Sequence, residues 1–385
     1  MRPPEQVTAA LRGRPGPICA YVYDTAALRD RAAEVRAALP PGTTLLYAVK
    51  ANGHPAVVRT LAAACDGLEV ASGGELDLAL AAGAPRIVFG GPAKTDTELA
   101  AAVAAGAQVN VESGHELRRL DRVARAAGTV VDAAVRVNRA APGPAGSHAM
   151  TGTPTPFGVD ERELSRVLAV PLTSVRLTGF HLHAVSNNLD AAVHARFVAD
   201  ALAWSVATAA RYGLTLRLVN VGGGLGVDHL GDATIDLDAL REGLAGLAVP
   251  PGVDLVVEPG RILAADAGWY AAEVVDLKHT HGRWFAVLRG GTHHFRLPAA
   301  WGYSHPFTVL EADDWPYEWA RPEVRDVAVD AVGELCTPRD VLARDRHVTR
   351  LRVGDVLVFG RTGAYGWDIS HHDFLRHPPP RFEVL

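Results

Sequence analysis

Lys50 stands directly after the apolar run 45–49 and before a turn-like Ala-Asn-Gly sequence at 51–53. An ammonium group at the end of a buried strand is costly unless it is paired, and desolvation lowers its pKa toward the range where the free amine is nucleophilic. Such an amine can form a Schiff base with a carbonyl compound. Taken alone, however, this lysine is more simply a strand-end charge that reaches solvent.

Four other features that could take part in catalysis or anion binding also lie at or shortly after the ends of apolar runs. They are His183, the glycine triplet 222–224, Glu258 and Arg261. Successive glycines let backbone N–H groups converge on an anion, and a nearby arginine adds a bidentate phosphate contact. A buried glutamate can keep a pyridinium nitrogen protonated. Each feature also has an ordinary interpretation, as a core histidine, a tight turn, a structural carboxylate or a surface charge.

The elements that must position these residues alternate between short apolar runs and helical patterns from residue 44 to 260. Several helical segments end at a glycine, as helix C-caps do: Gly83, Gly106, Gly128 and Gly213. Eight strands that are apolar on both faces favour a parallel (β/α)8 barrel over the alternative, a doubly wound open sheet. The expected strands are 44–50, 67–71, 86–90, 108–113, 130–138, 176–184, 216–222 and 254–259. In a barrel, the features described above would all lie at the C-terminal rim, where active sites form.

After residue 262 the pattern changes to β-like runs without intervening helices, at 273–278, 284–288, 327–332 and 355–359. The segment 18–24 has the same character. We therefore expect a barrel domain over residues 26–265. A discontinuous β-domain, a β-sandwich or β-barrel, is expected from residues 1–25 and 266–385.

Composition narrows the classes of function. The 385 residues carry a net charge of −5, which gives no electrostatic case for nucleic acid or an anionic membrane as partner. The three cysteines, at 19, 65 and 336, show neither disulfide-framework nor zinc spacing, so we expect a cytoplasmic protein without a metal. No secretory apolar segment opens the chain, and no run approaches membrane-spanning length.

With these motifs in hand, the chain resembles the fold-type III PLP-dependent decarboxylases, the alanine-racemase-like family that includes ornithine and diaminopimelate decarboxylases. The resemblance runs nearly end to end and rests on the combination of motifs. They are residues 47–52, 69–75, 111–117, 136–138, 183–186, 222–224, 258–261, 333–340 and 363–366. It implies a homodimer in which the segment containing Cys336 and Asp340 completes the partner's active site.

The resemblance also implies roles for individual residues. Lys50 carries the pyridoxal phosphate, His183 stacks on its ring, and Glu258 pairs with the ring nitrogen. The phosphate is held by Ser186, Gly223, Gly224, Arg261 and Tyr365. Cys336 is the acid that protonates the substrate carbon after carbon dioxide leaves.

The substrate is suggested by where the motifs depart from the best-known members. Diaminopimelate decarboxylases usually carry Glu-Ser after the catalytic cysteine, whereas this chain has Thr-Pro-Arg at 337–339. Segments 154–158, 290–298 and 366–375 are most similar to decarboxylases of siderophore biosynthesis, which act on citryl-diaminopropionate or citryl-serine. Because a citryl group is polyanionic, we expect cationic side chains to bind its carboxylates. The predicted substrate-binding residues are Arg136, His293, His294, Arg296, Arg339 and Asp340.

Four alternatives stay open. The substrate could be a free diamino acid (diaminopimelate, ornithine or lysine) or an aminoacyl group tethered to a carrier protein. A racemase would use the same lysine with a catalytic tyrosine on the opposite face, and Cys336 with Asp340 argues against that. A non-catalytic relative would be expected to lose Lys50 or Cys336, and both are present.

Overall fold

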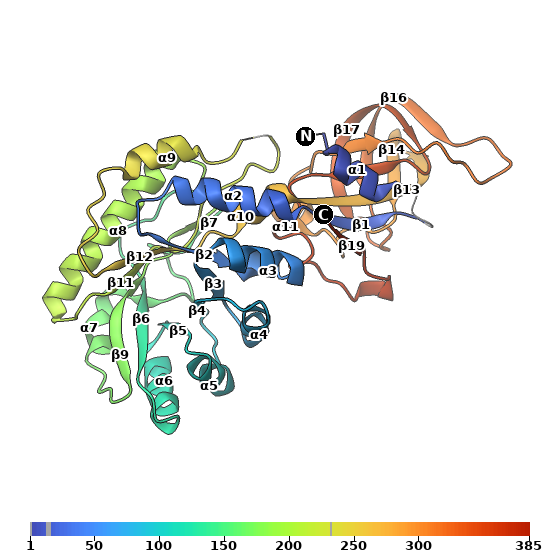
Figure 1. Cartoon of the computed structure of the whole chain (residues 1–385). Coiled ribbons are helices and arrows are strands. Elements are labelled where there is room, and N and C mark those ends of the chain that lie inside the picture. The colour runs from blue at the N-terminus through green and yellow to red at the C-terminus, as the bar shows by residue number, and fades with distance from the viewer. Residues whose placement is uncertain (1, 13–16, 232) are drawn as a thin grey trace. The chain divides into compact units, whose positions relative to one another are not determined.

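The computed structural model describes residues 2–12, 17–231 and 233–385. The chain divides into two compact units (Figure 1). One unit comprises Leu28–Val227 and Ala233–Leu263. The other contains the described residues up to Ala27, the short segment 228–231 and Ala264–Leu385. The segment 228–231 had been expected within the barrel range.

The first unit is a closed parallel barrel, as predicted, and not an open sheet. All eight expected strands are present, in the order β5-β4-β3-β2-β12-β11-β9-β6, and pairing of β5 with β6 closes the ring. The strands are β2 (Thr44–Ala48), β3 (Gly67–Val70), β4 (Ile87–Phe89), β5 (Gln108–Val111), β6 (Val131–Asn138), β9 (Val175–His181), β11 (Leu218–Asn220) and β12 (Asp254–Val257). Short strands β7 (His148–Ala149), β8 (Val159–Asp160) and β10 (Val185–Ser186) lie in the connections.

Helices follow the barrel strands, and side chains fix where several of them begin. Ser72 and Ser113 accept N–H groups at the starts of α4 and α6, and Thr95 forms a capping box with Glu98 at α5. The predicted terminal glycines, Gly83, Gly106, Gly128 and Gly213, all have a positive φ. The helices are α2 (Thr25–Ala37), α3 (Pro55–Ala64), α4 (Gly73–Ala81), α5 (Asp96–Ala104), α6 (Gly114–Ala126), α7 (Leu164–Leu168), α8 (Ala191–Tyr212), α9 (Leu237–Leu244) and α10 (Arg261–Ala264). Among the described residues, no helix is long and apolar enough to cross a membrane.

The interior of the barrel changes from apolar to polar along the strands. One buried layer consists of Leu46, Val88, Ala134, Leu218 and Val256. Because strand side chains alternate between two faces, the residue two positions further along each strand points to the same interior. For three of these strands that residue is polar: Arg136, Asn220 and Glu258. The apolar layer therefore supports a polar layer at the C-terminal ends of the strands.

The second unit is built around an eight-stranded sheet that includes the N-terminal strand, as predicted. Strand β1 pairs antiparallel with β13 and parallel with β19. The strands are β1 (Cys19–Tyr23), β13 (Gly268–Thr280), β14 (Arg283–Leu288), β15 (Thr308–Leu310), β16 (Glu323–Val332), β17 (Val341–Arg352), β18 (Val356–Phe359) and β19 (Arg381–Val384). Two short helices, α1 (Glu5–Leu11) and α11 (Leu297–Trp301), complete it.

Candidate active site

Lys50 lies just beyond β2, in a 3-10 turn formed by Val49–Ala51. Its side chain is 44% exposed, and its Nζ atom lies 2.5 Å from Oε2 of Glu69, whose side chain is only 5% exposed. The strand ends at Ala48, two residues before the predicted end, and Lys50 stands in the turn that follows, beside the buried Glu69. The amine is therefore accessible while a buried carboxylate holds it at the end of the barrel.

Glu258 follows β12 and has its carboxylate buried within the polar layer. Asn220 donates from Nδ2 to Oε1 at 2.5 Å, and Nε2 of His181 lies 3.3 Å from Oε2. Burial alone would raise the pKa of Glu258, but His181, Lys50 and the Asn220 hydrogen bond outweigh it and lower that pKa to about 2. The carboxylate is consequently ionised at neutral pH.

His183 is fixed by the glycine triplet that follows β11. The Gly223 N–H group donates to Nδ1 of His183 at 3.2 Å. Burial, and then the charges of Arg136 and Lys50, hold the pKa of His183 well below its usual value. The imidazole is thus neutral, and because Nδ1 accepts, its proton resides on Nε2. Gly222 has φ +69°, and a Cβ there would lie 2.4 Å from Nδ1, so this turn requires glycine.

Arg136 is held at the end of β6 by a buried ion pair. Its Nη1 donates to Oε1 of Glu112 at 3.0 Å, and its guanidinium lies 4.7 Å from the centre of the Phe157 ring. The other oxygen of Glu112 accepts the N–H group of Gly158 at 2.8 Å. Removing either residue of this buried ion pair would leave the charge of the other uncompensated. Glu112 and Arg136 therefore act as one unit.

Sequence reasoning missed four polar residues that the structure places in this layer: Glu69, Glu112, His181 and Asn220. Glu69 and Glu112 lie within motifs that were recognised, but neither was assigned a role. The signal that could have found Asn220 was strand alternation from the apolar Leu218, two residues earlier.

The remaining barrel residues of the prediction also follow barrel strands. Ser186 ends the short strand β10 and is partly buried, and its carbonyl oxygen accepts the Ser147 N–H group at 2.8 Å. Arg261 is the first residue of α10 and is 5% exposed. A Cβ at Gly223 would lie 2.5 Å from the Glu258 carbonyl oxygen, and Gly224 has φ +108°. The backbone of the triplet therefore passes too close to its neighbours for side chains.

Four predicted residues lie in the second unit with side chains that solvent reaches. Cys336 and Arg339 are exposed in the turn between β16 and β17, and Arg296 is exposed just before α11. Tyr365 is partly buried and has a left-handed backbone, with φ +55°. A non-glycine residue in this conformation is strained, and such strain occurs preferentially at binding sites.

Three other predicted substrate-binding residues are buried within the second unit. His293 and His294 are 0% exposed. The Asp340 carboxylate accepts the Thr292 N–H group at 2.6 Å and the Leu335 N–H group at 2.8 Å. The role of these three side chains in substrate binding stays a prediction. In this structure Asp340 holds two backbone segments beside the Cys336 turn.

Comparison with known proteins gives the site a context. Residues 25–265 match the family described as pyridoxal-dependent decarboxylase, pyridoxal binding domain. The chain is 40% identical to 2-[(L-alanin-3-ylcarbamoyl)methyl]-2-hydroxybutanedioate decarboxylase of Staphylococcus aureus, over 100% of this chain and 98% of the relative. It is 30% identical to L-glutamyl-[BtrI acyl-carrier protein] decarboxylase of Niallia circulans, over 95% and 88% of the two chains.

Solved structures agree on the fold of the whole chain. Diaminopimelate decarboxylase from Helicobacter pylori, complexed with L-lysine, has a TM-score of 0.86 at 25% identity and covers 98% of this chain and 94% of its own. The corresponding enzyme from M. jannaschii, also with L-lysine, has a TM-score of 0.85 at 25% identity, over 98% and 89%.

Proposed function

The chain belongs to the pyridoxal-dependent decarboxylases, and from that membership we propose that it removes the α-carboxylate of a citrate-conjugated amino acid. It is a PLP-dependent carboxy-lyase with the barrel fold of the fold-type III enzymes. The observation that carries the proposed substrate is the full-length 40% identity to the Staphylococcus aureus relative. The name of that relative describes a citrate joined through an amide to C3 of alanine.

The barrel residues fit pyridoxal phosphate. Lys50 offers an accessible amine, and Glu258 an ionised, buried carboxylate of the kind that keeps a pyridine nitrogen protonated. Bound pyridoxal phosphate supplies an electron-accepting ring that makes loss of an α-carboxylate feasible. We assign ring stacking to His183, and phosphate contacts to Ser186, Gly223, Gly224, Arg261 and Tyr365. The N–H groups of Gly222 and Gly223 already donate to Asn220 and His183. The assignment is therefore supported by Gly224, where φ +108° and the close approach of Val185 leave no room for a side chain.

Proton handling follows from the same contacts. Lys50 must lose a proton before its amine is nucleophilic, and Oε2 of Glu69, at 2.5 Å, is positioned to accept it. Neutral His183 adds no positive charge that would compete with the ring for electrons. Cys336, whose thiol is exposed, is assigned to return a proton to the substrate carbon. Arg296 and Arg339 are assigned to the citryl carboxylates, which arginine binds in bidentate geometry.

The test is carbon dioxide release by the PLP-loaded enzyme from a panel of substrates. The panel contains citryl-diaminopropionate, citryl-serine, diaminopimelate, ornithine, lysine and a glutamyl carrier protein. We expect turnover of a citryl conjugate, with a KM that rises at least about tenfold in Arg296→Ala and Arg339→Ala. Turnover of only a free diamino acid or the carrier conjugate would refute the citryl substrate and leave the decarboxylase intact.

We also propose a homodimer whose active sites are completed across the interface, in a cytoplasmic enzyme. The dimer proposal follows from the family membership, since the resemblance implies that the segment containing Cys336 completes the partner's active site. The cytoplasmic location is supported by three cysteines that form no disulfide.

A further inference from the structure

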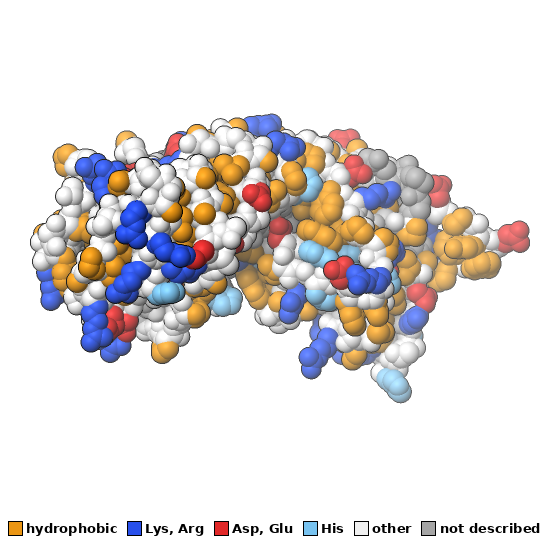
Figure 2. Space-filling view, turned by 90° about the horizontal axis from the view of Figure 1, so that it is seen from below, with side chains coloured by type: hydrophobic (Ala, Val, Ile, Leu, Met, Phe, Trp, Pro, Cys, Tyr) orange, Lys and Arg blue, Asp and Glu red, His pale blue; other side chains and the backbone are white. Residues whose placement is uncertain are grey.

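The loop 311–322 between β15 and β16 carries three aromatic side chains to the surface of the second unit. We call this loop the aromatic arm. Tyr317 is 51% exposed and Trp319 is 62% exposed, and Trp315 is partly exposed. Figure 2 shows hydrophobic side chains gathered on a projection that ends in acidic ones. Exposed aromatic clusters of this kind mark interaction sites, because monomeric surfaces seldom carry them.

The aromatic arm is ordered by its own contacts. The Tyr317 and Trp319 rings stack with centroids 4.5 Å apart and planes 20° apart, and Trp315 meets Tyr317 edge-on at 4.9 Å. Trp315 donates from Nε1 to the Trp319 carbonyl oxygen at 2.7 Å. The Arg321 guanidinium lies 5.7 Å from the Trp315 ring centre. The rings are thus fixed relative to one another before any partner arrives, which reduces the entropy lost on binding.

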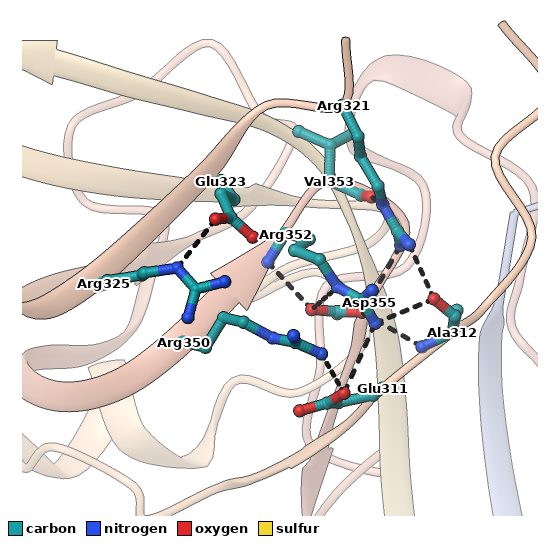
Figure 3. Close-up of polar contacts among 9 residues, drawn as sticks. All are labelled: Glu311, Ala312, Arg321, Glu323, Arg325, Arg350, Arg352, Val353 and Asp355. Atoms are coloured by element: carbon teal, nitrogen blue, oxygen red, sulfur yellow. Dashed lines mark hydrogen bonds and ion pairs between the residues drawn. The ribbon is translucent and has the colours of Figure 1, made fainter.

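The base of the aromatic arm is clamped to the sheet (Figure 3). Asp355, which is 0% exposed, accepts the Ala312 N–H group at 3.0 Å. Arg321 and Arg352 donate to the Ala312 carbonyl oxygen at 2.6 Å and 2.9 Å, and Arg352 also pairs with Asp355. Both ends of the loop are therefore held by partly buried, charge-assisted hydrogen bonds. This network does not use the exposed ring faces of Tyr317 and Trp319.

The charge on the aromatic arm selects the chemistry of its partner. Asp313, Asp314 and Glu318 are exposed in the same loop as the rings. At the base, Glu311 is paired with Arg350, and Asp313 interacts electrostatically with Arg321 and Arg352. Asp314 and Glu318 lie further along the loop. Aromatic faces attract cations, and carboxylates pair with them. Arginine satisfies both groups better than lysine, because its planar guanidinium stacks on rings and bonds carboxylates in bidentate geometry.

We propose that the aromatic arm is a docking surface for an arginine-bearing segment of a partner protein. A guanidinium stacks on the exposed ring of Trp319 or Tyr317 and pairs with Asp313, Asp314 or Glu318. This inference does not depend on the decarboxylase assignment, since no arm residue belongs to the active site.

The test measures binding of a fluorescent peptide of alternating arginine and glycine to the full-length, PLP-loaded protein by anisotropy. Matched peptides carry lysine or glutamate in place of arginine. The variants are Tyr317→Ala/Trp319→Ala, which keeps the charge, and Asp313→Asn/Asp314→Asn/Glu318→Gln, which keeps the rings. Matched controls in the barrel unit are Tyr212→Ala and Glu34→Gln/Glu163→Gln/Asp238→Asn, which remove an exposed ring and exposed carboxylates. Circular dichroism and unchanged decarboxylase turnover establish folding.

We expect the arginine peptide to bind more tightly than the lysine peptide, and the glutamate peptide not to bind. Each arm variant should weaken arginine-peptide binding about tenfold or more, and neither control should. If only the charge variant loses binding of the arginine peptide, the attraction is non-specific and the proposal is overturned. The proposal is also overturned if the wild type does not bind the arginine peptide. A smaller sedimenting mass of Tyr317→Ala/Trp319→Ala also overturns it, because the aromatic arm would then contact a second copy of this chain.

Discussion

Among individual residues, Glu258 shows most clearly how the barrel prepares its chemistry. A buried carboxylate would ordinarily favour its neutral form, yet His181, Lys50 and Asn220 keep this one ionised. The charge is therefore placed in the barrel interior before any cofactor binds, and it needs no reorganisation when the ring nitrogen arrives.

Substitution Glu258→Gln tests that role. The amide keeps the size of the side chain but cannot carry the charge, so we expect kcat to fall by about 10²–10³ while the protein stays folded. Steady-state carbon dioxide release measures kcat, and circular dichroism checks the fold. Glu34→Gln, an exposed change in the same unit, is the control and should leave kcat within about twofold of the wild type.

The same carboxylate should make stability depend on acid pH. Its pKa is about 2 in the folded chain, against 4.5 for an ordinary glutamate, so its stabilising contribution is complete above pH 4.5 and is lost as pH falls toward 2. At neutral pH we expect a higher free energy of unfolding for the wild type than for Glu258→Gln. This difference should be smaller at about pH 3. Urea denaturation of both proteins at the two pH values measures this difference. A pH-independent difference would contradict the assignment.

Among the elements, the glycine turn after β11 couples the backbone to His183. Gly222 has φ +69° and a Cβ there would press on the imidazole, whereas Gly213 at the end of α8 has φ +66° and nothing within 4 Å. The two positions therefore share a left-handed backbone, which an alanine would strain, and differ only in the clash of the added Cβ.

The pair Gly222→Ala and Gly213→Ala separates these effects. Both should lose about 1 kcal/mol or more of unfolding free energy from the left-handed backbone. Only Gly222→Ala should also displace His183, with about a tenfold or larger loss of PLP affinity measured from cofactor absorbance. Equal PLP affinity in the two variants would show that the turn does not position His183.

The elements were predictable where local patterns carry the information, and the site was less so. Apolar runs and terminal glycines such as Gly83 and Gly213 marked the barrel, because these signals are local. The 3-10 turn that carries Lys50 was missed, because a single turn after β2 leaves no periodicity to detect. The burial of His293 and the partners of Asp340 were also missed, since they depend on contacts between segments distant in sequence.

In the whole molecule, the proposed sharing of active sites between subunits can be tested by mixing two inactive variants. Lys50→Ala lacks the cofactor amine and Cys336→Ala lacks the proton donor. If the sites are shared, a mixed dimer contains one complete site, so random exchange should restore roughly a quarter of wild-type activity. Each variant alone should stay inactive. Recovery of no activity, despite sedimentation evidence for exchange, would contradict sharing.

The attachment of pyridoxal phosphate to Lys50 is the central claim, and the chain offers three lysines to distinguish: 50, 94 and 278. Lys94 is buried against Glu116, and Lys278 lies in the second unit. Borohydride reduction of the PLP-loaded enzyme, followed by peptide mass mapping, fixes the cofactor to the amine that holds it. We predict the pyridoxyl mass on the peptide containing Lys50, and its absence from Lys50→Ala. A label on another lysine, or on none, would contradict the account.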